Sequence, residues 1–567
     1  MLGKRKSQSQ LFDVGNVYPL SLKPSSFHAQ LASAASRLFK DEDFAAIYSD
    51  KRGRPSVPPS LLALTLLMQN EAKVSDEEAV LRTEFDLRWA AVLGRFAGEP
   101  LCAKSTLQLF RAQLIIHDEA RTVFLASINE AKRAGLLKGN ALRVALDTKP
   151  IDGRGATLDT YNLLASGIRQ LSKALAKSGK ENPEHWMRKR GLIRYTEPSV
   201  KGSADIDWSD PDARNAFLSE IVRDARHLLS IASTRDEAVL EASDLLAKLL
   251  LQDIEDTESG GGSKIKQGTA RDRIPSSTDP DQRHGRKSKS KTFVGSKASV
   301  AVDVDSQIIV ATDVIPGNAG DATGALDLVE QAESNTGTDV SESLGDCAYG
   351  GGETRAEFAD CGRKLIAKVP MEKSNGEFFP KSAFALDLEN NTVMCHAGET
   401  VDKYEQMRDG RKIFRFGKVC AGCSLRDQCT KARGGRIVSV HPQEALLREA
   451  REYQSTAEGR AHLRERVAVE HALARLGRLG IGQARCIGTA NTRFQLMMAA
   501  SVANFRRTWN WEESQRGQEA SALSAHGLCK EQSACLAVSI RFIQHILSRF
   551  VWAVGKATPQ FAQSLAA

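Results

Sequence analysis

Apolar residues recur at helical spacing in several short stretches near the start of the chain, after a polar tail at residues 1–24. The apolar run at residues 61–68 is typical of a buried helix. Ser75 and Ser105 are each followed three residues later by Glu or Gln, which is the pattern of a capping box at a helix start. The pattern predicts an all-helical domain over residues 25–140, with enough helices to include a helix-turn-helix, although no run of side chains identifies a recognition helix.

Short runs of β-branched and other apolar residues then predict β-strands. The first run, at residues 142–146, ends at Asp147. Two further runs, at residues 298–304 and 308–315, are separated by three polar residues and predict a β-hairpin. A helix, a strand and a late helix are then expected at residues 321–333, 364–369 and 464–479. This mixed order of strands and helices predicts an α/β core.

Two long insertions interrupt the predicted core, which extends over residues 141–510. The first, at about residues 156–292, begins with a helical pattern and continues into a segment rich in Gly, Ser, Asp and Arg, typical of a flexible linker or exposed loop. The second, at about residues 371–460, carries several cysteines. Residues 511–567 remain as a C-terminal tail, in which residues 537–554 have an amphipathic helical pattern.

Composition narrows the class of protein. The 567 residues allow several domains, and 41% hydrophobic with 26% charged residues excludes a disordered or collagen-like chain. The longest apolar stretch near the N-terminus is too short to span a bilayer, and no export signal precedes it. Ten cysteines are therefore expected to be reduced thiols or metal ligands in a cytoplasmic protein. The net charge of +8 favours polyanionic partners.

Three acidic residues stand where an α/β core places its ligands. Asp147 ends the first predicted strand, Asp346 follows a later strand, and Glu470 lies on the late helix. Three converging carboxylates make an all-oxygen site suited to Mg²⁺ or Mn²⁺, and two such ions activate a nucleophile for in-line displacement at a phosphodiester. Spacing alone does not select these three among the 70 acidic residues of the chain.

Residues 145–149 (ALDTK), 345–350 (GDCAYG) and 466–471 (RVAVEH) closely resemble the three catalytic segments of DDE transposases of bacterial insertion sequences. The resemblance covers roughly residues 25–508, and it implies that the helical domain at residues 25–140 binds DNA. It implies a ribonuclease-H-like core in which Asp147, Asp346 and Glu470 bind two divalent ions, Mg²⁺ or Mn²⁺. It also implies cleavage of transposon ends, joining to target DNA, and a homodimer on paired ends. The protein would then be cytoplasmic and associated with the nucleoid when bound to DNA.

Two basic residues have an expected role through the same resemblance. Arg466, four residues before Glu470 on the same predicted helix face, matches the arginine that holds the transposon-end backbone in relatives. Leu463 and Gly477 replace the tyrosine and lysine of that family pattern, which leaves a hairpin intermediate open. The alternative for Arg466 is simple pairing with a carboxylate. Lys297 matches a family lysine near the substrate, and its alternative is an edge-strand lysine that discourages aggregation.

Asp321 stands at the start of the helix predicted at residues 321–333. Together with Asn318 it resembles a family loop beside the active site. Its short carboxylate also suits the N-cap of the helix, and capping is the role that the pattern favours.

A basic segment precedes the predicted hairpin. Residues 283–291 carry five full positive charges, on Arg283, Arg286, Lys287, Lys289 and Lys291. Such a loop binds a phosphate backbone by releasing counterions. A solvated linker is the alternative, but the position next to the predicted catalytic strands favours DNA contact.

Four cysteines in the second insertion have a spacing that suits zinc. Cys420 and Cys423 form a C-x2-C pair, with Cys395 and Cys429 on either side. A C-x2-C pair supplies half of a tetrahedral zinc site, and Cys429 with Cys395 or the neighbouring His396 would complete it. The resemblance extends to a cysteine cluster in this region. Reduced thiols that merely pack are the alternative.

Two alternatives to a transposase remain at this point. One is a catalytically silent, transposase-derived DNA-binding protein, against which the intact Asp, Asp, Glu set argues. The other is a metal-dependent DNA nuclease that cuts without joining, which predicts the same three carboxylates.

Overall fold

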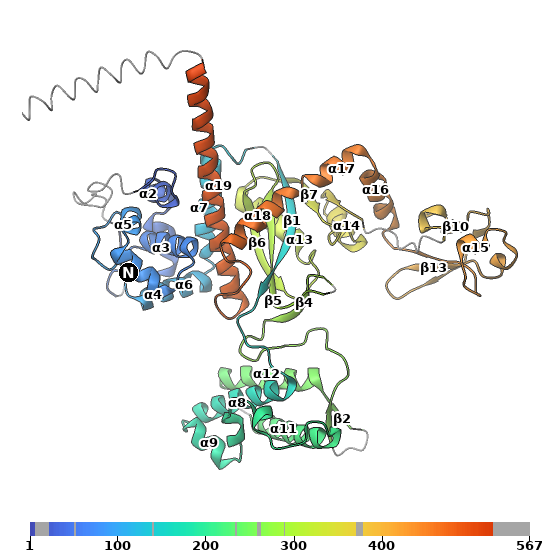
Figure 1. Cartoon of the computed structure of the whole chain (residues 1–567), viewed down its shortest axis with the longest axis horizontal. Helices are drawn as coiled ribbons and strands as arrows, with labels where there is room; N and C mark the ends of the chain where they lie inside the picture. Colours follow the sequence, from blue (N-terminus) through green and yellow to red (C-terminus); the bar gives the residue numbers. More distant parts are fainter. Residues whose placement is uncertain are drawn as a thin grey trace, which may run out of the picture. The chain divides into compact units, whose positions relative to one another are not determined.

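The computed structural model describes residues 1–5, 22–49, 53–138, 141–232, 235–257, 262–288, 290–369 and 378–525 (Figure 1). Met1–Phe505 form one compact unit. The helix predicted at residues 537–554 lies outside the described residues. Among the helices that the structure describes, none is long and apolar enough to cross a membrane.

The largest sheet is mixed and has six strands, several of which are labelled in Figure 1. Its order is β4-β5-β1-β7-β8, and β6 also pairs with β5. Strand β5 is antiparallel to β1, β4 and β6, whereas β7 is parallel to both β1 and β8. The strands are β1 (Leu142–Asp152), β4 (Arg283–Arg286), β5 (Thr292–Asp303), β6 (Ile309–Pro316), β7 (Val340–Gly345) and β8 (Leu365–Ala367).

The register of β1 brings two acidic residues to one level of the sheet. Ala145 lies opposite Leu344 of the parallel strand β7, so Asp147 and Asp346 each stand two residues further along. Strand β7 ends before Asp346, whereas β5 continues to pair with β1 as far as Asp152. The prediction that the first strand ends at Asp147 is therefore wrong. The strand continues because β5 goes on pairing with its backbone N–H and C=O groups.

The other predicted elements of the core form with shifted bounds. The hairpin is β5 and β6, and the strand near residue 366 is β8. The helix after the hairpin is α13 (Ala325–Thr336), which begins four residues later than predicted with Gly324 at its N-cap. The late helix is α18 (Val467–Arg478), followed by α19 (Thr489–Ala525). Helix α14 (Gly352–Asp360) lies between β7 and β8 in the chain.

Residues 27–133 fold into helices with short connections. Ser75 caps one helix by accepting a hydrogen bond from the backbone N–H of Glu78, as predicted. Ser105 caps none, because its helix begins one residue earlier, after Ala103. The helices are α2 (Phe27–Leu38), η1 (Asp41–Ile47), α3 (Pro59–Ala72), α4 (Asp76–Phe85), α5 (Leu87–Leu93), α6 (Lys104–Ile116) and α7 (Ala120–Arg133).

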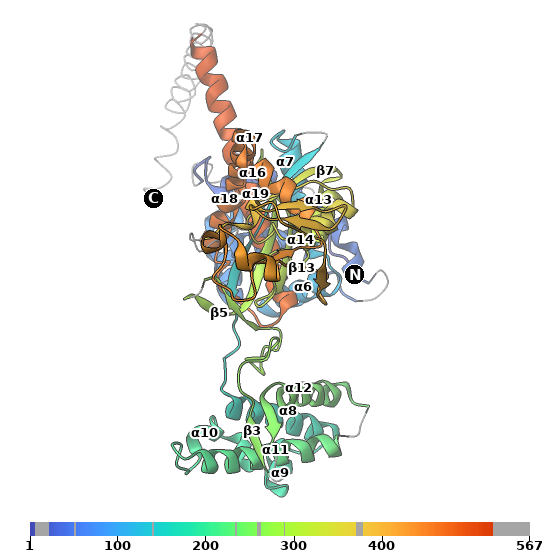
Figure 2. The ribbon, with the colours of Figure 1, turned by 90° about the vertical axis from the view of Figure 1, so that its right-hand side faces the viewer.

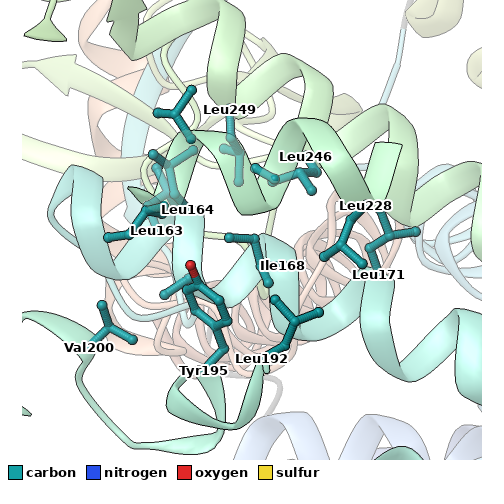
Figure 3. Close-up of a cluster of buried hydrophobic side chains, with 14 of the residues drawn as sticks. Leu163, Leu164, Ile168, Leu171, Leu192, Tyr195, Val200, Leu228, Leu246 and Leu249 are labelled. Atoms are coloured by element: carbon teal, nitrogen blue, oxygen red, sulfur yellow. The ribbon is translucent and has the colours of Figure 1, made fainter. Parts of the chain in front are cut away.

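The first insertion has its own hydrophobic core, built mainly by three long helices (Figures 2 and 3). Helices α8 and α12 approach closely at Gly167, where a Cβ atom would lie 3.0 Å from Leu246 and 3.1 Å from Leu249. The elements are α8 (Thr160–Ser178), α9 (Pro183–Lys189), η2 (Ile193–Thr196), α10 (Val200–Ser203), α11 (Pro211–Ile231), α12 (Glu237–Asp253), β2 (Ile254–Asp256) and β3 (Ser263–Ile265).

The last part of the first insertion is the polar segment at residues 259–291, and its described residues are more ordered than a flexible linker. Strands β3 and β4 lie within it, and β4 pairs with β5. Ser276, Asp279 and Gln282 are buried, and Gln282 donates a hydrogen bond to Asp279 at 2.9 Å. Residues 266–282, between the two strands, form a loop as predicted, but this loop is partly buried and held by side-chain hydrogen bonds, so it is not an exposed linker throughout.

The second insertion contains two three-stranded sheets, of orders β11-β10-β9 and β12-β13-β14. Phe384, Val393, Phe414 and Val438 belong to its small core. The elements are η3 (Lys381–Ala383), β9 (Ala385–Asp387), β10 (Thr392–Met394), β11 (Thr400–Val401), β12 (Tyr404–Gln406), β13 (Lys412–Arg415), η4 (Gly417–Gly422), α15 (Arg426–Cys429), β14 (Ile437–Val440), α16 (Glu444–Ser455) and α17 (Ala457–Arg464).

The packing of α12 predicts unequal effects of two leucines on the same helix. Leu246 is fully buried, whereas Leu251 is 73% exposed. We expect Leu246→Ala to cost about 2–5 kcal/mol of local stability, because it removes buried methyl groups and leaves a cavity. The matched change Leu251→Ala should alter stability by less than about 0.5 kcal/mol. Hydrogen exchange of the α8 and α12 amides measures both, and equal protection in the two variants would contradict the packing described.

Candidate active site

Asp147 on β1 and Asp346, the residue that follows β7, each lie two residues beyond the paired residues Ala145 and Leu344. Asp147 accepts a hydrogen bond from the backbone N–H of Thr148 at 2.7 Å, and Asp346 accepts one from that of Ala348 at 2.8 Å. Burial raises the pKa of Asp147, and the charges of Asp346 and Asp321 raise it further. The Thr148 hydrogen bond and the Arg466 charge oppose this rise. The site thus concentrates negative charge.

Glu470 joins this site through Arg466. Glu470 is in the first turn of α18, and Arg466 is the N-cap residue of that helix. One guanidinium nitrogen of Arg466 lies 3.0 Å from Asp147, and the other lies 2.5 Å from Glu470. Arg466 therefore bridges two of the three predicted catalytic carboxylates, and the carboxylate pairing considered as an alternative for Arg466 does occur.

Asp321 also belongs to this site, in a role other than the predicted helix cap. Its Oδ1 accepts hydrogen bonds from the Thr148 hydroxyl at 2.7 Å and from the Lys297 ammonium at 2.8 Å. The cap position of α13 is occupied instead by Gly324. The prediction of capping is wrong, because the loop after β6 carries Asp321 back towards β1 before the helix starts.

Lys297 is not an edge-strand lysine. It lies on β5 between Pro150 of β1 and Ile315 of β6, and it is buried. Its ammonium group donates to Asp321 and to the backbone carbonyl of Ala319 at 2.6 Å. A lysine paired on both sides within a sheet cannot protect an edge, so that alternative is wrong.

Tyr349 lies behind the carboxylates and was not predicted from the sequence. It is fully buried. Burial, together with the charges of Asp147, Asp321 and Asp346, raises the pKa of its hydroxyl. Tyr349 is part of the GDCAYG segment, three residues after Asp346, and this position was the only signal in the sequence that could have identified it.

A second polar cluster attaches α17 to the sheet, and the sequence did not predict it either. Glu342 of β7 accepts hydrogen bonds from Arg143 at 2.8 Å, from His462 at 2.7 Å and from Lys364 at 3.1 Å. The hydroxyl of Tyr453 lies 2.8 Å from the other ring nitrogen of His462. Because Arg143 also pairs with Glu465, this cluster fixes the segment just before α18.

The basic segment at residues 283–291 is only partly a loop. Arg283 and Arg286 are the end residues of β4, and Arg283 donates to the backbone carbonyls of Pro280 and Gln282. Arg286, Lys287 and Lys291 are exposed, and Lys289 lies outside the described residues.

The four cysteines of the second insertion line one small cavity of about 20 Å³, together with His396. The backbone N–H of Arg436 donates to the Cys420 sulfur at 3.5 Å. Burial raises the pKa of Cys429, and the other three thiols raise it further, against the charge of Arg436. The structure thus brings together the cysteines that the sequence grouped.

Neither cluster is arranged as a complete metal site. Within the described part of the chain, no group of three or more His, Cys, Asp or Glu side chains is placed to hold an ion. At the carboxylates, Arg466 takes up the positions around Asp147 and Glu470.

Two family models match the chain. Residues 22–113 match a transposase domain (DUF772), and residues 394–509 match a transposase DDE domain. The second match includes Arg466 and Glu470 but neither Asp147 nor Asp346. No curated protein and no solved structure matches the chain significantly. The two family matches support a DDE transposase of the insertion-sequence type, in agreement with the resemblance of the catalytic segments.

The Glu342 cluster predicts a pH-dependent contribution to stability. Burial would raise the pKa of Glu342, but hydrogen bonds from Arg143, His462 and Lys364 lower it to about 2, from 4.5. Glu342→Gln should therefore cost about 3 kcal/mol at pH 7, because it removes the buried negative charge that Arg143, His462 and Lys364 share. A depressed carboxylate pKa stabilises above the unfolded value of 4.5, and this contribution is lost as the pH falls towards 2.

Urea unfolding of the wild type and of Glu342→Gln at pH 7 and pH 3 measures this difference. The gap between the two proteins should narrow at pH 3. Glu353→Gln, on the exposed surface of α14, is the control and should change little at either pH. A gap that is equal at both pH values would show that Glu342 does not titrate as described.

Proposed function

Taking the chain as a DDE transposase of the insertion-sequence type, we propose that it cleaves transposon ends and joins them to target DNA. The observation that carries this proposal is that β1 and β7 bring Asp147 to the level of Asp346, while Arg466 links Glu470 of α18 to Asp147. These segments are 124 or more residues apart in the chain, so their convergence is a property of the fold. The six-stranded mixed sheet would then be the ribonuclease-H-like core that the resemblance implies.

The residues at this site fit a divalent metal. Asp147, Asp346 and Glu470 would hold it, since carboxylate oxygens are the ligands that Mg²⁺ and Mn²⁺ prefer. The raised pKa of Asp147, caused by burial and by neighbouring carboxylates, indicates negative charge that a cation would stabilise. When bound, two such ions supply activation of a water or 3′-hydroxyl nucleophile and stabilisation of the leaving oxygen.

Three residues of the chain support these carboxylates. Arg466 is placed to exchange its contacts with Asp147 and Glu470 for a DNA phosphate, which a guanidinium binds with two parallel hydrogen bonds. Lys297 and Asp321 orient Thr148, whose backbone N–H binds Asp147. We propose a substrate role for Arg466 and a positioning role for the Lys297–Asp321 pair.

The proposed function requires the chain to bind DNA outside the carboxylate site as well. The exposed residues Arg286, at the end of β4, and Lys287 and Lys291, between β4 and the long strand β5, would contact the phosphate backbone. Lys289 and Arg283 belong to the same basic segment. A homodimer on paired transposon ends follows from the family resemblance.

We also propose a structural zinc ion bound by Cys395, Cys420, Cys423 and Cys429. Support comes from the single cavity that the four side chains line and from the backbone N–H that donates to the Cys420 sulfur. Four thiolates are a common tetrahedral donor set for structural zinc, and small folds with little core often depend on such an ion.

The cleavage proposal predicts the behaviour of three substitutions. Asp147→Asn, Asp346→Asn and Glu470→Gln should each lower Mg²⁺-dependent cleavage by at least about 100-fold, because each removes a charged metal ligand. The substrate is a labelled duplex that carries the ends of the element encoding this chain, and end binding should persist. Asp360→Asn, on the exposed end of α14, is the matched control.

Strand joining to a second duplex, measured in the same reactions, separates a transposase from a nuclease. Wild-type protein that binds the ends but never cuts would favour the silent DNA-binding protein. Substitutions that leave cutting intact would overturn the assignment of the carboxylates.

The zinc proposal predicts about one zinc ion per chain in the purified protein. Cys423→Ser should lose this metal and lower the thermal stability of the second insertion, since three thiolates bind zinc more weakly than four. Cys361 is an exposed cysteine outside the cluster, so Cys361→Ser should keep both the zinc ion and the wild-type thermal stability. Atomic emission and thermal unfolding measure the two effects, and wild-type protein without zinc after metal-replete expression would rule out the proposal.

A further inference from the structure

One short stretch of the second insertion is strongly basic. Residues 403–436 contain ten Lys and Arg residues against three Asp and Glu residues, a net charge of +7. The whole chain of 567 residues has a net charge of +8. By contrast, residues 156–256 of the helical insertion contain fourteen basic and seventeen acidic residues. The excess is therefore local, and it lies outside the basic segment at residues 283–291.

Some of these basic residues have a structural role. Arg426 donates to the carbonyls of Cys420 and Ala432, and Arg436 donates to those of Cys429 and Phe379. These contacts hold together the loops around the cysteine cavity.

Two further arginines are paired with acidic residues on the surface. Arg411 binds Asp409, and Arg415 binds Glu405 across β12 and β13. Exposed pairs of this kind contribute little to stability, and their charges cancel locally.

Six basic residues remain. Lys412 donates to Asn391, and the Lys431 ammonium lies 5.5 Å from the ring centre of Phe378. We call the other four the insertion basic patch: Lys403, Arg408, Lys418 and Arg433. All four are exposed, and none has an acidic partner among the residues that the structure describes. Lys403 and Arg408 flank β12, Lys418 is on η4, and Arg433 is in the loop before β14. All four thus lie within the stretch from β12 to β14.

Exposed apolar side chains stand beside three of these four residues. Tyr404 and Met407 are each 41% exposed and adjoin Lys403 and Arg408, while Val419 is 46% exposed and adjoins Lys418. Cations interleaved with aromatic and apolar groups fit a nucleic acid, which offers phosphates together with sugar and base surfaces. An acidic protein surface would not require the apolar groups.

We propose that the insertion basic patch is a DNA-binding surface for duplex DNA, separate from the carboxylate site. This inference rests on the proposed function for the choice of duplex DNA, and it gives the cysteine-bearing insertion a role beyond folding. The cysteine cavity and the carbonyl contacts of Arg426 and Arg436 hold the loops that present the patch.

The test uses the full-length protein and a fluorescent, mixed-sequence 40-base-pair duplex in Ca²⁺, over a range of salt concentrations. The variant Lys403→Gln, Arg408→Gln, Lys418→Gln, Arg433→Gln should bind at least about tenfold more weakly at 100 mM salt. The slope of log affinity against log salt should become shallower by about 0.9 for each lost phosphate contact, or about 2–4 in all.

The matched control removes four exposed positive charges from the helical insertion: Lys177→Gln, Lys180→Gln, Lys189→Gln, Arg223→Gln. It should bind with the wild-type affinity and slope. An equal loss in both variants would show a net-charge effect only and would overturn the inference, as would a patch variant with wild-type binding. Thermal unfolding and zinc content confirm that the patch variant is folded.

The binding and cleavage measurements distinguish failure of this inference from failure of the proposed function. A wild-type protein that binds in Ca²⁺ but never cuts in Mg²⁺ leaves the patch standing and overturns the proposed catalysis. A patch variant that binds and cuts DNA as the wild type does would overturn the DNA-binding role of the patch without affecting the proposed catalysis.

Discussion

The pairing of strand β1 on both of its edges is the constraint on which the site depends. Val144, Ala145 and Leu146 are fully buried, and β1 pairs with β5 along one edge and with β7 along the other. A slip of one residue would turn every side chain to the opposite face of the sheet, so burial fixes the register. The register in turn fixes the level of Asp147 beside Asp346. The position of Asp147 therefore depends on the burial of the strand that carries it.

The third carboxylate depends on a different kind of contact. Glu470 is on a helix, and hydrogen bonds of Glu342 with Arg143 and His462 hold the segment that precedes this helix against the sheet. Buried polar networks of this kind contribute specificity of position more reliably than stability, because desolvation offsets much of their attraction. Crowding Asp147, Asp321 and Asp346 around buried Tyr349 also opposes folding, a cost that is typical of functional sites.

The two insertions differ in how they fold. The first has a large apolar core of its own between α8, α11 and α12, which accounts for its stable helices. The second has a small core and two short sheets, and it carries the cysteine cavity and the strongly basic stretch at residues 403–436. A small core leaves less hydrophobic stabilisation, so a metal crosslink is physically reasonable there and not in the first insertion.

The sequence by itself determined the kinds of element and the chemistry available to them. Hydrophobic periodicity predicted the hairpin of β5 and β6 and the late helix, because such patterns depend only on neighbours along the chain. The resemblance of short segments selected Asp147, Asp346 and Glu470, of which the family match covers only Glu470.

Tertiary structure decided everything that depends on a distant partner. It extended β1 to Asp152, because the long strand β5 pairs with it. It also placed Asp321 where its carboxylate accepts a hydrogen bond from Lys297 and does not cap the helix. Neither outcome is encoded within a few residues of the position concerned. Local sequence sets backbone preference and polarity, whereas pairing, burial and the neighbours of each charge are set by segments that are far apart in the chain.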